Sequence, residues 1–161
     1  TTAQELLQKM NGIVPSDDEF YSNFLIASVT KSALARYYLR TLEDQYNGIS
    51  EQEFLPNPDS GVMTLEHILP QNPTKDWEHL DPETINDYYQ RIGNLALLTR
   101  KVNAAIGNSG FSEKKSVLGQ SGYALTKIVA EKDVWGIKEI EDRQKLLAKL
   151  AIKAWPNQVL P

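Results

Sequence analysis

The stretch TLEHILPQN, residues 64–72, places one of the chain's two histidines directly after a glutamate and shortly before a proline. A helix is disfavoured here, because Pro70 restricts Leu69 to extended geometry and has no N–H group to donate. A short strand that runs into a turn fits the stretch better. The side chains of Glu66 and His67 are then expected next to each other at a strand end, where chemistry is often found.

The segment that follows this stretch predicts a partner strand and a helix. GNLALLT, residues 93–99, is apolar and short, and a helix is expected to begin at about Arg100. Between the two strands, residues 81–92 predict a helix with Asp81 as its N-cap and Pro82 at its first position. The centre of the chain is therefore expected to form a β-β-α unit that contains a helical insertion.

The rest of the chain is expected to be helical. Apolar residues recur at helical spacing, and capping and stop signals bound several segments; Ser16, for example, is a candidate N-cap. The predicted helices cover residues 3–10, 16–29, 31–46, 112–118, 122–131 and 138–154. We therefore expect an α+β protein that is predominantly helical.

The composition is that of an ordinary globular domain. The chain has 161 residues, with 41% hydrophobic and 24% charged residues, which suits one domain with its own core. It contains no cysteine, which excludes disulfides and thiolate zinc sites and fits a reducing compartment. It shows neither an apolar run of about 20 residues nor a signal peptide, so no membrane association is expected. Because it begins without Met, we expect it to be a piece of a longer chain.

The charge is unevenly distributed. The whole chain carries a net charge of −4, yet all but one of the charged residues between Arg91 and Lys127 are basic. A basic middle in an acidic chain could serve a local anionic substrate. It could equally be a chance cluster on a solvated face, and the charge pattern alone does not separate these two interpretations.

The two central segments, EHILPQ at 66–71 and GNLALLTRKVN at 93–103, resemble the HNH, or His-Me finger, nucleases. The shared pattern is an acid or His before the catalytic His, a hydrophobic-x-Pro sequence, an Asn before Leu, and a final His or Asn on the helix. Together with Trp77 and the sequence VNAAIGNSGFSEKK at 102–115, the match is most similar to one branch of these nucleases. That branch forms the C-terminal domain of GmrSD-type modification-dependent restriction enzymes and related phage-defence proteins.

The resemblance implies a fold and a domain layout. A small ββα-metal (His-Me finger) core, wrapped by helices, is expected over residues 62–118, with the helical insertion inside it. A helical N-terminal part at 1–58 and C-terminal helices at 119–161 complete a single HNH-type nuclease domain spanning 1–161.

The resemblance also implies a function. It is that of a metal-dependent DNA endonuclease or nickase of the bacterial cytoplasm, which hydrolyses phosphodiester bonds with Mg²⁺ or Mn²⁺ to restrict foreign or modified DNA. Its expected partner is a ParB-like nucleotide-hydrolysing sensor domain in the same chain or another. The alternative is a catalytically silent DNA-binding or protein-interaction module on the same frame. A zinc hydrolase is disfavoured, because two distant histidines are too few for the common zinc ligand sets.

The resemblance assigns catalytic roles to His67 and Asn94 and metal ligation to Glu66 and Asn103. His67 corresponds to the general base, since an ordinary imidazole pKa near 6.5 leaves it available at neutral pH. Asn94 corresponds to the residue that orients the loop and the base. Glu66 and Asn103 offer the oxygen atoms that a hard divalent ion prefers. Structural roles stay open for all four, as a histidine packed in a turn, a turn residue, a solvated strand-end acid and a helix-surface amide.

Further residues are candidates for weak contacts with DNA phosphates, although a solvated helix face explains the bases equally well. These candidates are Gln71, Arg100, Lys101, Lys114 and Lys115. No base-reading constellation is evident, so little sequence specificity is expected. His79 is expected on the surface, Asn108 at a helix stop, and the three tryptophans, Trp77, Trp135 and Trp155, in packing positions.

Overall fold

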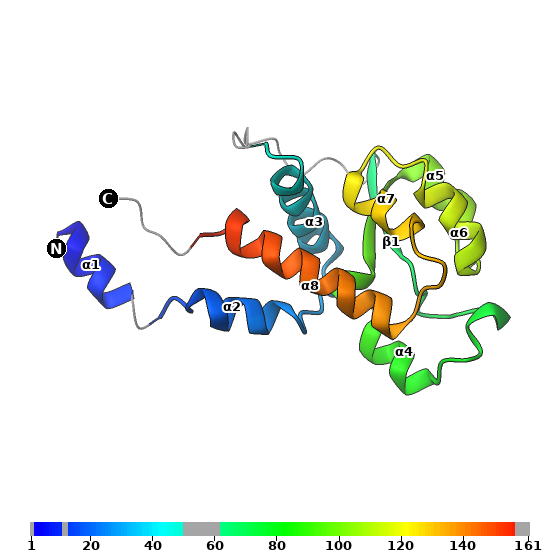
Figure 1. Ribbon diagram of the computed structural model, residues 1–161, viewed down its shortest axis with the longest axis horizontal. Helices are drawn as coiled ribbons and strands as arrows, with labels where there is room; N and C mark the ends of the chain where they lie inside the picture. Colours follow the sequence, from blue (N-terminus) through cyan, green and yellow to red (C-terminus); the bar gives the residue numbers. More distant parts are fainter. Residues whose placement is uncertain (1, 11–12, 50–61, 157–161) are drawn as a thin grey trace.

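The computed structural model describes residues 2–10, 13–49 and 62–156. Within these ranges the chain is α+β and mostly helical, with one two-stranded antiparallel sheet (Figure 1). No helix of the described ranges has the length and apolar character needed to cross a bilayer. The α-helices and strands are α1 (Ala3–Met10), α2 (Asp17–Phe24), α3 (Ser32–Tyr46), β1 (Met63–His67), α4 (Pro82–Tyr88), β2 (Leu95–Thr99), α5 (Arg100–Ile106), α6 (Phe111–Leu118), α7 (Ala124–Ala130) and α8 (Ile137–Ala154). Two short 3-10 helices of the described ranges, η1 (Lys75–Trp77) and η2 (Ile92–Asn94), lie before α4 and β2.

The sheet consists of β1 and β2, paired in an antiparallel register that sets His67 opposite Leu95 and Glu66 opposite Ala96. Opposed residues of an antiparallel pair share a face of the sheet, and successive residues alternate between faces. The first four residues of β2 are buried, so this strand is covered on both sides. The sheet therefore lies inside the protein, and each of its faces has its own helices.

Two hydrophobic clusters sandwich the sheet. Leu95 and Leu97 belong to one cluster, with residues of α2, α3 and α8. Ala96 and Leu98 belong to the other, with residues of α5, α6, α7 and α8. Figure 1 shows α5 and α6 on one side of β1 and α3 on the other. Glu66, opposite Ala96, therefore faces the side of α5 and α6.

Local signals at helix starts agree with the sequence-based expectations. The hydroxyl of Ser16 accepts a hydrogen bond from the Glu19 N–H at 3.3 Å, and the Glu19 carboxylate accepts from the Ser16 N–H at 2.9 Å. This reciprocal capping box begins α2. Asp81 caps α4 by accepting from the Thr84 N–H at 2.9 Å, with a proline at the first helical position.

Two helices are shorter than predicted: α4, expected over residues 81–92, ends at Tyr88, and α2, expected over 16–29, also ends early. Helical spacing of apolar residues extends to Val29, but α2 ends at Phe24. Val29 instead donates its N–H to the carbonyl of Gln90 at 2.9 Å, and Ser28 forms a β-bridge with Arg91. Val29 is still buried in the core, as its apolar character predicted, although the helix has already ended at Phe24. The predicted loop at 55–61 lies outside the described residues.

Candidate active site

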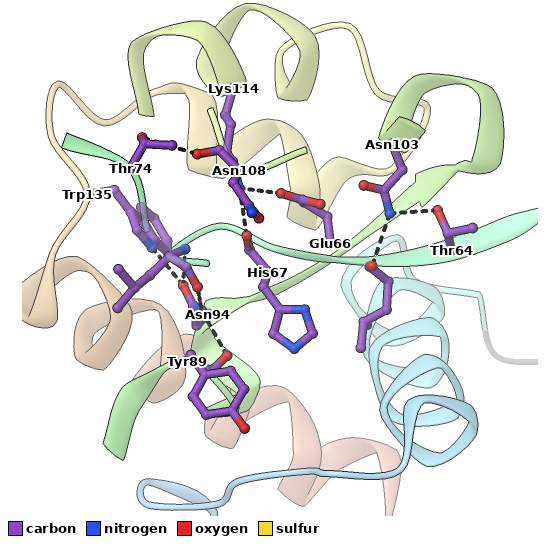
Figure 2. A network of polar contacts seen from close by, with 12 residues as sticks. Thr64, Glu66, His67, Thr74, Tyr89, Asn94, Asn103, Asn108, Lys114 and Trp135 are labelled. Atoms are coloured by element: carbon purple, nitrogen blue, oxygen red, sulfur yellow. Dashed lines mark hydrogen bonds and ion pairs between the residues drawn. The ribbon is translucent and has the colours of Figure 1, made fainter. Parts of the chain in front are cut away.

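The end of β1 carries Glu66 and His67. Glu66 and His67 are consecutive in the strand, so their side chains leave it on opposite faces, as Figure 2 shows. The carboxylate of Glu66 is buried on the side of α6. The imidazole of His67 lies beside the ring of Tyr89, with 5.9 Å between the ring centroids. The strand end therefore offers an acid on one face and an imidazole on the other.

The buried carboxylate of Glu66 has a cationic partner, Lys114. The Lys114 ammonium lies 2.5 Å from Glu66 Oε1 and donates a second hydrogen bond to the main-chain oxygen of His67 at 2.8 Å. The Lys114 side chain is 0% exposed, so its ammonium presents no surface to a DNA phosphate, which differs from the expectation of a surface base. The reason is its position three residues after Phe111 and four before Leu118, on the face of α6 that packs against the core.

Burial shifts the pKa values of the Glu66 carboxyl and the His67 imidazole in opposite directions. Burial raises the pKa of the Glu66 carboxyl above its ordinary value, and the charge and hydrogen bond of Lys114 oppose this rise. Burial also lowers the pKa of the His67 imidazole, and the nearby Lys114 charge lowers it further. His67 is therefore neutral at pH 7, which is the form that can accept a proton.

Asn103 connects α5 to the same strand. Its side-chain amide donates two hydrogen bonds, to the Thr64 hydroxyl and to the Leu65 carbonyl oxygen, both at 3.0 Å. Thr64 lies two positions before Glu66, so both side chains share one face of β1. No described residue donates a hydrogen bond to the amide oxygen of Asn103. Figure 2 shows that oxygen on the side of the amide that faces Glu66.

Asn94 is completely buried, and its amide is fully committed. Its oxygen accepts from the Leu69 N–H at 2.8 Å and from the Trp135 indole N–H at 3.0 Å. Its nitrogen donates to the carbonyl oxygens of Leu69 and Tyr89, both at 2.9 Å. A side chain with no accessible surface and four hydrogen bonds cannot touch a substrate, so its place in the site is to hold the turn that follows His67 (Figure 2).

Asn94 is in turn held by α8, a contribution that the sequence analysis missed. Arg143 donates to the carbonyl oxygens of Gly93 and Leu95, both at 2.7 Å, and the side-chain oxygen of Gln144 accepts from the Gly93 N–H at 2.8 Å. Both side chains are buried. A signal was present in the sequence, since two polar residues lie on the apolar face of α8, and buried polar groups must be hydrogen-bonded.

The donor set fits a hard divalent ion. Glu66 keeps one carboxylate oxygen, and Asn103 its amide oxygen, without a hydrogen-bond donor among the described residues. Two oxygen ligands suit Mg²⁺ or Mn²⁺, which retain several waters. In residues 2–10, 13–49 and 62–156, no three His, Cys, Asp or Glu side chains form a metal-binding group. The structure brings Glu66 and Asn103 to one face of β1, whereas the imidazole of His67 points to the other (Figure 2).

The remaining candidates lie around this centre. Gln71, Arg100 and Lys101 are exposed, and Lys115 is 3.5 Å from Asp133 with its side chain 36% exposed. His79 is on the surface, as expected, and stacks on Trp77. Trp77 and Trp135 are buried, and Trp155 packs against aromatic rings of α2 and α3. Tyr89, beside His67, was not found from the sequence, where it had no distinguishing signal.

Comparison with known proteins identifies the family. The family model described as "GmrSD restriction endonucleases, C-terminal domain" matches residues 14–150. The match covers most of the chain, including both strands and the helices that hold the candidate site. No curated protein matches the chain. The chain belongs to the family of C-terminal domains of GmrSD restriction endonucleases.

Proposed function

We propose that this member of the GmrSD C-terminal domain family is a metal-dependent DNA endonuclease or nickase of the HNH, or His-Me finger, type. The observation that carries the proposal is the arrangement of Glu66, His67 and Asn103 at an antiparallel strand pair that runs directly into a helix. Acid, base and amide oxygen are the groups that this type of phosphodiester hydrolysis requires. The family match to restriction endonucleases supports the same reaction class.

In this proposal, His67 is the general base. Its neutral imidazole takes a proton from the attacking water, and its lowered pKa keeps it in the accepting form at neutral pH. Asn94 positions the base by holding the turn at Leu69, two residues further along. Glu66 and Asn103 would hold Mg²⁺ or Mn²⁺, which when bound stabilises charge on the phosphate and on the leaving oxygen. Glu66 and His67 leave the end of β1 on opposite faces, so the proposal requires a phosphate bound at that strand end to contact both sides.

The proposed substrate is foreign or modified DNA in the bacterial cytoplasm. Arg100 and Lys101, exposed at the start of α5, and Gln71, exposed after the turn, would contact backbone phosphates. Phosphate contacts position DNA without reading its sequence. We therefore assign target choice to the ParB-like nucleotide-hydrolysing domain expected as partner, and we assign cleavage to this single domain.

The test compares the two histidines of the chain. The readout is nicking of supercoiled plasmid DNA in Mg²⁺ or Mn²⁺, with a chelator as the blank. His67→Ala is expected to reduce the rate by at least about 100-fold, the usual lower bound for loss of a general base. His79→Ala is the matched control, because His79 is exposed and lies outside the site, and it should keep the wild-type rate. Circular dichroism checks that both variants are folded.

Two outcomes would refute the proposal. Undiminished cleavage by the His67→Ala variant would show that this imidazole is not the base. DNA binding without any divalent-dependent turnover by the wild-type chain would favour the alternative, a catalytically silent binding module on the same frame.

A further inference from the structure

Lys114 contacts both the proposed metal ligand, Glu66, and the main chain of the proposed base, His67. It extends from α6 into the space between the helix and β1, as Figure 2 shows, and its ammonium contacts Glu66 Oε1 and the His67 carbonyl oxygen. The side chains of Lys114 and Glu66 are 0% and 7% exposed, so water screens this pair little. A buried ammonium with two oxygen partners in the candidate site needs an explanation beyond packing.

The ammonium changes the charge of the candidate metal site. Without Lys114, Glu66 would offer a divalent ion a full negative charge in a buried place. With Lys114, the carboxylate and the ammonium together are neutral. A divalent ion that binds the other oxygen of Glu66 must share one carboxylate with a cation that is already there, and the two cations repel each other.

We propose that Lys114 is a positioning residue that acts as an internal counter-cation of Glu66. It fixes the carboxylate and the strand end before a divalent ion arrives, and it lowers the affinity of the site for that ion when no DNA is bound. The negative charge of a DNA phosphate offsets the repulsion, so the ion binds firmly only together with the substrate. This inference rests on the proposed function, because it takes Glu66 as the metal ligand.

A purely structural lysine predicts a different result. If Lys114 only held α6 against β1, its removal would lower the free energy of unfolding and leave metal affinity unchanged or weaker. A counter-cation predicts the opposite sign for metal affinity, because its removal leaves the full charge of the carboxylate to the divalent ion. The sign of the change in metal affinity therefore separates the two roles.

The experiment measures binding of Mn²⁺ alone, without DNA, from the electron paramagnetic resonance signal of the free ion at pH 8. Lys114→Met is expected to bind Mn²⁺ at least about tenfold more tightly than the wild-type chain, since a unit charge near a divalent ion easily exceeds that effect. Lys115→Met, the neighbouring lysine with a partly exposed side chain, is the matched control and should stay within about twofold of the wild type. Adding Glu66→Gln to Lys114→Met should abolish the gain.

Lys114→Gln keeps the test decisive if the Met variant does not fold, because its side chain still ends in a hydrogen-bond donor while lacking the charge. Equal or weaker Mn²⁺ binding by a folded Lys114 variant overturns this inference and leaves the proposed nuclease function standing. No Mn²⁺ binding by any variant overturns the metal site itself and, with it, this inference. Plasmid nicking by the His67 and His79 variants then decides the fate of the nuclease function separately.

Discussion

Replacing Asn94 by Asp tests whether this buried amide fixes the turn after His67. The substitution keeps the shape and keeps the oxygen that accepts from Leu69 and Trp135. It replaces the NH₂ group, which donates to the carbonyl oxygens of Leu69 and Tyr89, by a second oxygen. Three oxygens then meet at a position with no accessible surface, and the only relief inside the folded protein is protonation of the carboxyl.

The magnitude follows from these contacts. Two lost hydrogen bonds account for about 2 kcal/mol of the free energy of unfolding, and the buried, poorly compensated oxygen for about another 2 kcal/mol. The total of about 4 kcal/mol is a large share of the roughly 5–15 kcal/mol of a typical domain. The folded-state pKa of Asp at position 94 would lie above its ordinary value near 3.9. Stability is then present at low pH and is lost as the pH rises through the folded-state pKa, so the deficit should be about 1–2 kcal/mol smaller at pH 5 than at pH 8.

The assay is urea denaturation of the wild type and the variant at both pH values, followed by far-ultraviolet circular dichroism. Comparison at equal pH removes the pH dependence of the wild type. Asn108→Asp is the control, because Asn108 is exposed, and it should change stability by less than about 0.5 kcal/mol. A deficit below about 1 kcal/mol for Asn94→Asp, or one that is the same at pH 5 and pH 8, would refute the reasoning.

Two further predictions concern the base and the turn that carries Asn94. The rate of plasmid nicking should fall in acid with a midpoint below pH 6.5, because burial and the Lys114 charge lower the pKa of His67. Initial rates between pH 5 and 8 measure this midpoint. A midpoint at or above pH 6.5 contradicts the assignment of His67 as the base. Gly93→Ala should cost about 2–3 kcal/mol in thermal or urea unfolding, because its Cβ would collide with the Ile140 carbonyl oxygen. Gly122→Ala should leave the free energy of unfolding nearly unchanged, because its added Cβ would have no neighbouring atom within 4 Å.

The strands and most helix boundaries could be predicted because their signals are local. Pro70 ends the extended segment that contains β1, and Asp81 with Pro82 begins α4 through a cap and a fixed φ angle. The apolar run before Arg100 gives β2, which is buried on both faces. These signals act within a few residues, so no knowledge of the tertiary structure is needed to read them.

The partners of the candidate site could not be predicted in the same way. Lys114 and Lys115 are neighbours of the same type, yet one is buried against Glu66, 48 positions away, and the other is partly exposed. Because both residues are lysines, their charge and hydropathy cannot tell the buried one from the exposed one. The helical spacing of Lys114 from Phe111 and Leu118 does indicate the buried face of α6, but lysines are in general solvated, so the residue type favours the surface.

The position of His67 is decided by side chains that lie far from it in the sequence. Lys114 holds its main-chain oxygen, and Asn94 holds Leu69 two residues further along, so the backbone is fixed at His67 and in the turn that follows it. Asn94 depends on Gln144, which binds the Gly93 N–H and also donates to the Ala27 carbonyl oxygen at 2.9 Å. The strand end is thereby tied through α8 to the segment after α2. Because these ties reach outside residues 62–118, the unit formed by β1, β2 and α5 does not by itself contain the contacts that position His67.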